Sequence, residues 1–178
     1  MFEFFDRCFA LLCGQNAEHT WAPGGLLLPC CQRCLGLYVG AGIAAWLHWR
    51  LRPRLSRRFL ETHGVFLLLM APCGLHWLPQ NALLRTISGV LFGFGVAAFL
   101  WVPLRACAPG AIAQVRFGYG IGLAATLVLT PLLAAIGGAP AAYGLAGLAL
   151  VGAVALALLV LANAGLVLSQ VFHFFGSS

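Results

Sequence analysis

The stretch LPCCQRCLGLYVGAG, residues 28–42, places three cysteines and one arginine directly before a glycine-rich apolar run. The chain around it has 178 residues, of which 62% are hydrophobic and 8% are charged, and its mean hydropathy is +0.97. A soluble domain carries roughly 25% charged residues, so this chain has too little polar surface to cover a globule in water. We therefore expect one all-α domain over residues 1–178, a polytopic membrane helix bundle.

Five apolar segments approach the ~20 residues that a helix needs to cross a bilayer. The predicted spans are residues 34–49, 63–79, 86–104, 117–136 and 143–167. Before them, residues 2–13 have one polar and one aromatic face, which predicts a short interfacial helix with Phe2, Phe5 and Phe9 in lipid. The domain then divides into an outer-face segment (1–33), three spans with the cysteines and arginines (34–104) and two packing spans (117–168).

The arginines predict the orientation, because cytoplasmic loops of membrane proteins are enriched in basic residues. All ten basic residues are arginine: five lie in residues 50–58, and Arg105 and Arg116 flank another connection on the same side. The other side receives three. We expect a multi-pass plasma-membrane protein with its N-terminus outside and its C-terminus in the cytoplasm. The net charge of +6 then reflects topology and contact with the lipid bilayer, and nucleic acid is not an expected partner.

Glycines recur four residues apart in three of the predicted spans. Small residues at this spacing let membrane helices approach closely. The pairs are Gly36 with Gly40, Gly89 with Gly93, and Gly118 with Gly122. They predict close helix packing, within the chain, with a second copy, or with helices of a larger membrane complex.

The topology brings cysteines from distant parts of the chain to the outer face. Cys13 follows the interfacial helix, Cys31 and Cys34 lie at the mouth of the first span, and Cys73 and His76 fall in the outer third of the second. Zinc favours tetrahedral sites built from cysteine and histidine. The first three cysteines supply three ligands, and Cys73 or His76 a fourth, so the preferred prediction is a transition-metal site, zinc first.

Two other interpretations use the same thiols. Cys31 and Cys34 form a C-x-x-C motif, and Arg33 and the helix start would lower a thiol pKa, which suits a thiol–disulfide oxidoreductase. Such an enzyme would exchange with Cys13 and pass electrons to a quinone, by analogy with other small bundles. Alternatively, Cys13 and one partner form a structural disulfide, or the thiols are inert, and the chain is a structural accessory subunit. Whether the protein is an enzyme stays open.

Polar residues surround the predicted site. We assign Arg33, Asn81 and Arg85 to binding a cofactor or a ligand headgroup there, although Arg85 could instead extend to the lipid headgroups. His19 is a weaker ligand candidate. The histidines at the inner span ends are expected to be interfacial: His48, His63 and His173.

Three segments, CGQ at 13–15, LPCCQRCLGLYVG at 28–40 and NALLRTISGVLFG at 81–93, resemble a prokaryotic family of small predicted membrane proteins of unknown function. Its members carry C-H-Q, then P-x-C-x-R-C-x-G-[IL]-Y-x-G, then an Asp-Gly and an N…R…T-G element. Gly14 stands here in place of the family's His, and Cys73 in place of its Asp. The resemblance covers about the first hundred residues. It implies a membrane location in a prokaryote and a shared outer-face site, but no reaction. The matching positions are Cys13, Gln15, Pro29, Cys31, Arg33, Cys34, Gly36, Tyr38, Gly40, Gly74, Asn81, Arg85 and Gly89.

Overall fold

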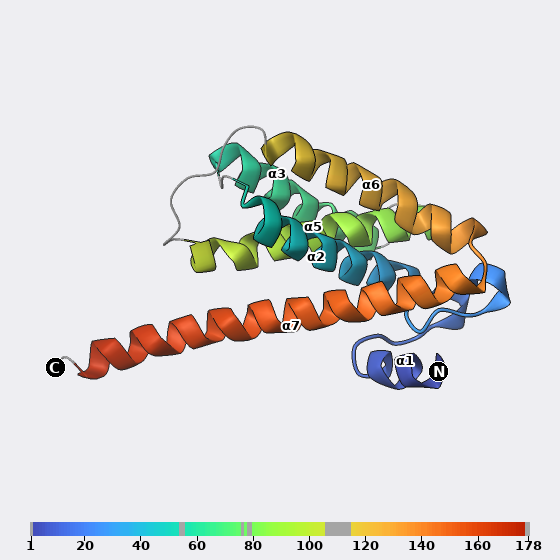
Figure 1. Cartoon of the computed structure of the whole chain (residues 1–178), viewed down its shortest axis with the longest axis horizontal. Coiled ribbons are helices and arrows are strands. Elements are labelled where there is room, and N and C mark those ends of the chain that lie inside the picture. The colour runs from blue at the N-terminus through green and yellow to red at the C-terminus, as the bar shows by residue number, and fades with distance from the viewer. Residues whose placement is uncertain (1, 54–55, 76, 78–79, 106–114, 177–178) are drawn as a thin grey trace.

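The computed structural model shows a bundle of helices (Figure 1) and describes residues 2–53, 56–75, 77, 80–105 and 115–176. Within these residues the regular secondary structure is helical, which confirms the predicted all-α class. In chain order the helices are α1 (Phe2–Ala10), α2 (Gln32–Leu51), α3 (Arg57–Leu68), α4 (Met70–Gly74), α5 (Ala82–Arg105), α6 (Val115–Ile136) and α7 (Ala139–Gly176). Two short 3₁₀ turns, Ala17–His19 and Pro23–Gly25, lie in the connection between α1 and α2.

Three helices are long and apolar enough to cross a membrane: Ala82–Leu104, Phe117–Ile136 and Ala139–Gln170. They correspond to the last three predicted spans. The count of five spans includes α2 and the pair α3–α4, which do not meet that standard of length and apolarity. Five therefore remains a prediction.

Helix α2 is less apolar than the three long helices, and neighbouring helices surround it. Its 20 residues extend about 30 Å, yet it carries an arginine at each end and His48 between them. Eleven of the 20 are buried. Since α5, α6 and α7 all contact α2, its Gln32 and His48 are buried in protein, and a sequence measure of apolarity underestimates how deeply the helix lies in the bundle.

The second predicted span is broken and shifted. Helix α3 begins at Arg57, where Ser56 caps it by accepting a hydrogen bond from the Phe59 N–H at 3.3 Å. It ends at Leu68, four residues before Pro72, and proline has no N–H to donate to the Leu68 carbonyl. The short helix α4 then ends at Gly74. The predicted end of this span, residues 76 and 78–79, lies outside the described residues.

Glycines on α2 and α5 bring these two helices together, and the close packing agrees with their spacing. A methyl group added at Gly40 would lie 2.6 Å from the Val90 carbonyl oxygen, and one at Gly93 would lie 2.7 Å from the Ala41 nitrogen. Gly36 and Gly89 are equally close to the facing backbone. Only glycine fits at such positions, so the two helices pack backbone to backbone.

The other faces of α2 pack differently. Gly42 meets Gly152 of α7, where an added methyl would lie 2.8 Å from the Gly152 Cα. The third predicted pair, Gly118 and Gly122 on α6, instead faces the side chains of Leu51 and Leu47. Helix α6 thus packs against leucines, and close backbone contact belongs to α5 and α7.

The helix directions divide the bundle into two ends (Figure 1). Helices α2, α5 and α7 run one way, while α3 and α6 run the other. The end of α2 with Arg50, the start of α3 with Arg57 and Arg58, and the end of α5 therefore lie together, at the end where α7 finishes. The starts of α2 and α7 lie at the opposite end, beside α1. The arginine-rich and cysteine-rich parts of the chain are thus separated along the bundle.

Candidate functional site

The first helix places the N-terminal segment against the bundle. Phe9 is fully buried and its ring lies 5.6 Å from that of Tyr38, whose hydroxyl donates to the Leu12 carbonyl at 3.3 Å. Phe2 meets Tyr143 of α7 edge to face, with 5.0 Å between the ring centroids. The predicted helix is present, but its aromatic face packs against protein, so the expectation that Phe9 lies in lipid is wrong.

Two side chains hold the connection that follows α1. Gln15 has a positive φ of 46°, and its amide nitrogen donates to the carbonyls of Asp6 at 2.9 Å and Pro29 at 3.0 Å. The indole N–H of Trp21 donates to the hydroxyl of Thr86 at 2.8 Å. These bonds tie the segment of residues 13–31 to α1, to itself and to the start of α5, which holds Cys13 in position.

Three thiols meet at the start of α2. The sulfur atoms of Cys13, Cys31 and Cys34 all lie within 4.8 Å of one another. Cys31 is the N-cap residue of α2, and its backbone N–H donates to the Cys13 sulfur at 3.3 Å. All three residues are half-buried and carry free thiols. In the described part of the chain, no other group of three or more histidine, cysteine or acidic side chains converges in this way.

The thiols differ in their electrostatics. The neighbouring Cys34 thiol lowers the pKa of Cys31 below that of an ordinary cysteine. The adjacent Cys30 is buried, and burial raises its pKa. The lowered pKa favours the thiolate form of Cys31, whereas Cys30 is buried in the core.

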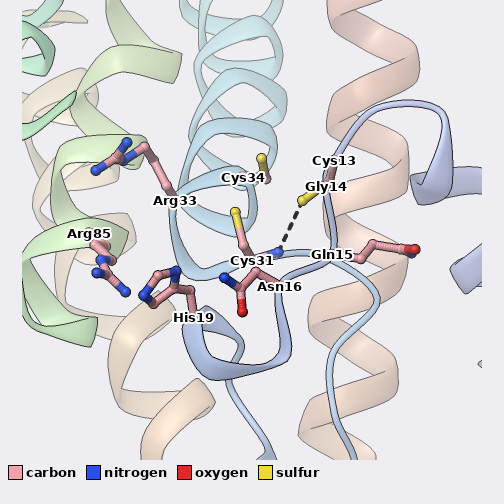
Figure 2. A pocket seen from close by; sticks show the side chains of 9 residues that line it. All are labelled: Cys13, Gly14, Gln15, Asn16, His19, Cys31, Arg33, Cys34 and Arg85. Atoms are coloured by element: carbon pink, nitrogen blue, oxygen red, sulfur yellow. Dashed lines mark hydrogen bonds between the residues drawn. The ribbon is translucent and has the colours of Figure 1, made fainter. Parts of the chain in front are cut away.

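A cavity of about 440 Å³ opens beside the three sulfurs. Figure 2 shows Arg33, Arg85 and His19 on one side of it and the cysteines on the other. Its remaining lining residues are Gly14, Gln15 and Asn16. A ligand in this cavity would touch sulfur and cationic groups together.

Arg33 connects the cavity to α4. Its Nη2 donates to the Cys73 carbonyl at 2.9 Å and to the Gln80 side-chain oxygen at 3.0 Å. The carbonyl of Cys73 is thus part of the surroundings of the site. Its thiol does not belong to the group of converging sulfurs, and Cys73 is buried.

The other residues predicted for the site differ in whether they line the cavity. Arg33 and Arg85 both line the cavity. Asn81 is not a lining residue, and its side-chain oxygen caps α5 by accepting from the Leu84 N–H at 2.7 Å. His76 lies outside the described residues. His19, the weaker candidate, does line the cavity, while Gln80, which anchors Arg33, gave no signal in the sequence.

A second polar cluster lies at the arginine-rich end. The ring of His63 is 3% exposed, and its nitrogens bond to the Phe59 carbonyl at 2.8 Å and the Tyr119 hydroxyl at 3.0 Å. His48 is fully buried and stacks on Tyr119 with 5.3 Å between ring centroids. Both histidines are therefore buried among the helices, against Phe59 of α3 and Tyr119 of α6, and their interfacial depth stays a prediction.

Residues 13–99 match the model of a family described as "Predicted membrane protein (DUF2085)". The matched region begins at Cys13 and includes every lining residue of the cavity. No curated protein and no solved structure matches the chain. Together with the long apolar helices, this similarity over residues 13–99 supports a membrane protein and assigns no function.

Proposed function

We propose that Cys13, Cys31 and Cys34 bind a transition metal, zinc first, at the extracytoplasmic face of a five-span membrane protein. The observation that carries the proposal is the convergence of the three sulfurs within 4.8 Å. Two of them come from the first turn of one helix, but Cys13 arrives from a separate segment that four hydrogen bonds and a buried phenylalanine hold in place. Such convergence is characteristic of a built site.

The spacing fits a thiolate site. Zinc–sulfur bonds of about 2.3 Å in a tetrahedron put two sulfurs about 3.8 Å apart, so the cluster would contract by at most about 1 Å from 4.8 Å. Half-burial leaves the sulfurs reachable, as metal entry requires. A bound metal would supply Lewis acidity or structural cross-linking, and three protein ligands would leave one coordination position toward the cavity.

The outer location follows from the arginines. The thiols lie at the end of the bundle opposite Arg50, Arg57 and Arg58. If those residues face the cytoplasm, as the positive-inside rule favours, then the thiol site faces outward. A prokaryotic plasma membrane is the compartment that the family resemblance favours.

Zinc content tests the metal proposal. Protein purified without chelator should carry about one zinc per chain, and Cys13→Ser or Cys34→Ser should lower that value several-fold. Cys8→Ser is the matched control, because Cys8 is a half-buried thiol on α1 that is not in the cluster. A metal content near zero in the wild type, after growth with added zinc, would rule the metal function out.

The lowered pKa of Cys31 favours a second candidate, thiol–disulfide exchange. The Cys31 thiolate would attack a partner disulfide, forming a mixed disulfide and releasing one partner thiolate. Cys34, after losing its proton, would then attack the Cys31 sulfur, release the second partner thiolate and leave a Cys31–Cys34 disulfide. Two electrons pass to the partner.

Trapping distinguishes this candidate from the first. Cys34→Ser would leave a mixed disulfide on Cys31 unresolved, so a covalent adduct should accumulate in non-reducing gels and disappear on reduction. The C8S control should show no adduct. If the Cys34→Ser protein forms no adduct under oxidising conditions, the exchange function is excluded.

A further inference from the structure

The cavity beside the thiols carries positive charge that no described acidic side chain balances. Arg33 and Arg85 both line it, and the ion pair that the described residues form lies elsewhere, between Arg57 and Glu61. Charge at a membrane site normally pairs with an opposite charge or a ligand. Two half-buried guanidinium groups therefore give the wall of this cavity a positive charge.

One hydrogen-bond donor points to the same conclusion. The Nε of Arg33 is buried and has no hydrogen-bond partner, although Nη2 of the same group has two. Buried N–H groups without partners are rare in folded proteins. The Arg33 guanidinium, which belongs to a lining residue of the cavity, thus has one donor that no described group satisfies.

The wall of the cavity has the composition of an oxyanion site. Figure 2 shows the Arg85 guanidinium next to His19, with the side chain of Asn16 nearby. Guanidinium groups bind carboxylate and phosphate oxygens through paired, charge-assisted hydrogen bonds. Imidazole and amide groups add further donors.

From these observations we infer that Arg33 and Arg85 make this cavity a binding site for an oxyanion of the phosphate or carboxylate class. The site goes beyond the proposed metal function, because guanidinium groups keep their charge whether or not the thiols hold a metal. The oxyanion has two sources at a membrane surface: a free solute, or the headgroup of an anionic lipid.

The test uses full-length protein, treated with chelator to remove metal, in lipid nanodiscs. One arm uses discs of phosphatidylcholine alone with added inorganic phosphate, and chloride at equal ionic strength as the reference. The other uses discs with phosphatidylglycerol and no phosphate. Both arms measure the thermal midpoint of unfolding and the alkylation rate of Cys31, whose sulfur lies on the cavity.

Arg85→Gln is the principal variant, with Arg7→Gln as its control. Arg7 is exposed on α1 at the same end of the bundle and does not line the cavity. In the wild type, the oxyanion should raise the thermal midpoint and slow Cys31 alkylation. Losing a charge-assisted hydrogen bond should raise the half-saturating concentration about tenfold or more in R85Q, with no change in R7Q.

The two arms distinguish a free oxyanion from a lipid headgroup. An effect of phosphate in the neutral discs assigns a free oxyanion, whereas an effect of phosphatidylglycerol alone that R85Q loses assigns a lipid headgroup. If neither probe protects Cys31 in the wild type, or if R85Q and R7Q respond alike, the inference is overturned. If R85Q fails to fold, Arg85→Lys replaces it; this variant keeps the charge and should retain binding. Protection of Cys31 in the wild type then tests whether an oxyanion binds in the cavity.

Discussion

At the residue scale, the chemistry of the site depends on one sulfur. The neighbouring Cys34 thiol lowers the pKa of Cys31, so Cys31 should react as a thiolate at pH values where an ordinary cysteine, with a pKa of about 8.5, is still protonated. In metal-free protein, the midpoint of its alkylation rate against pH should lie below 8.5. Cys34→Ala removes the donor and should move the midpoint upward, whereas Cys8→Ala should not. An unchanged midpoint in C34A would contradict this account of Cys31.

A second residue-scale prediction concerns the buried pair at the arginine-rich end. Since the Nδ1 of His63 faces the Phe59 carbonyl, it carries the proton, and Nε2 accepts from the Tyr119 hydroxyl. Tyr119→Phe leaves Nε2 without a donor and should destabilise the protein by about 0.6–1.7 kcal/mol, measured as a lower thermal midpoint in detergent. Tyr143→Phe is the control, because Tyr143 is 40% exposed. Equal midpoints for the two variants would show that the pair contributes nothing.

At the element scale, the packing of α2 against α5 depends on glycines that leave no space for a side chain. Gly40→Ala puts a methyl group 2.6 Å from the Val90 carbonyl oxygen, so the helices must separate and the thermal midpoint should fall. Gly147→Ala is the matched control on α7, where an added methyl meets nothing within 4 Å and the higher helix propensity of alanine should keep or raise the midpoint. The packing account fails if both variants melt alike.

Some of these helices can be predicted from the sequence and others cannot. Apolar length identifies α5, α6 and α7, and glycine spacing predicts close helix packing without naming which helices meet. Helix α3 begins at Arg57, after the capping residue Ser56. The predicted span begins only at residue 63, because Arg57 and Arg58 are too polar for a membrane-crossing segment. The enclosure of His63 depends on which helix faces α3, and no local pattern carries that information.

The site itself was partly predictable. C-x-x-C spacing puts Cys31 and Cys34 one helical turn apart, so their proximity follows from helix geometry. That the Cys13 sulfur lies against them depends on the bonds made by Gln15 and Trp21. These are long-range contacts between polar side chains and backbone, which sequence spacing cannot specify.

At the scale of the whole molecule, the two ends of the bundle have different chemistry, and the proposed orientation can be tested directly. In a cysteine-free background, Asn16→Cys introduces an exposed thiol beside the cavity, and Arg52→Cys an exposed one at the opposite end. In intact cells, a membrane-impermeant maleimide should label N16C at once and R52C only after permeabilisation. The reverse pattern would place the thiol site in the cytoplasm.

The central claim is that Cys13, Cys31 and Cys34 act together on one metal ion, and X-ray absorption at the zinc edge of the zinc-loaded protein measures this directly. We predict three sulfur neighbours at about 2.3 Å, falling to two in Cys13→Ser and remaining three in Cys8→Ser. A shell of nitrogen and oxygen alone, or a sulfur count that Cys13→Ser leaves unchanged, would contradict the claim.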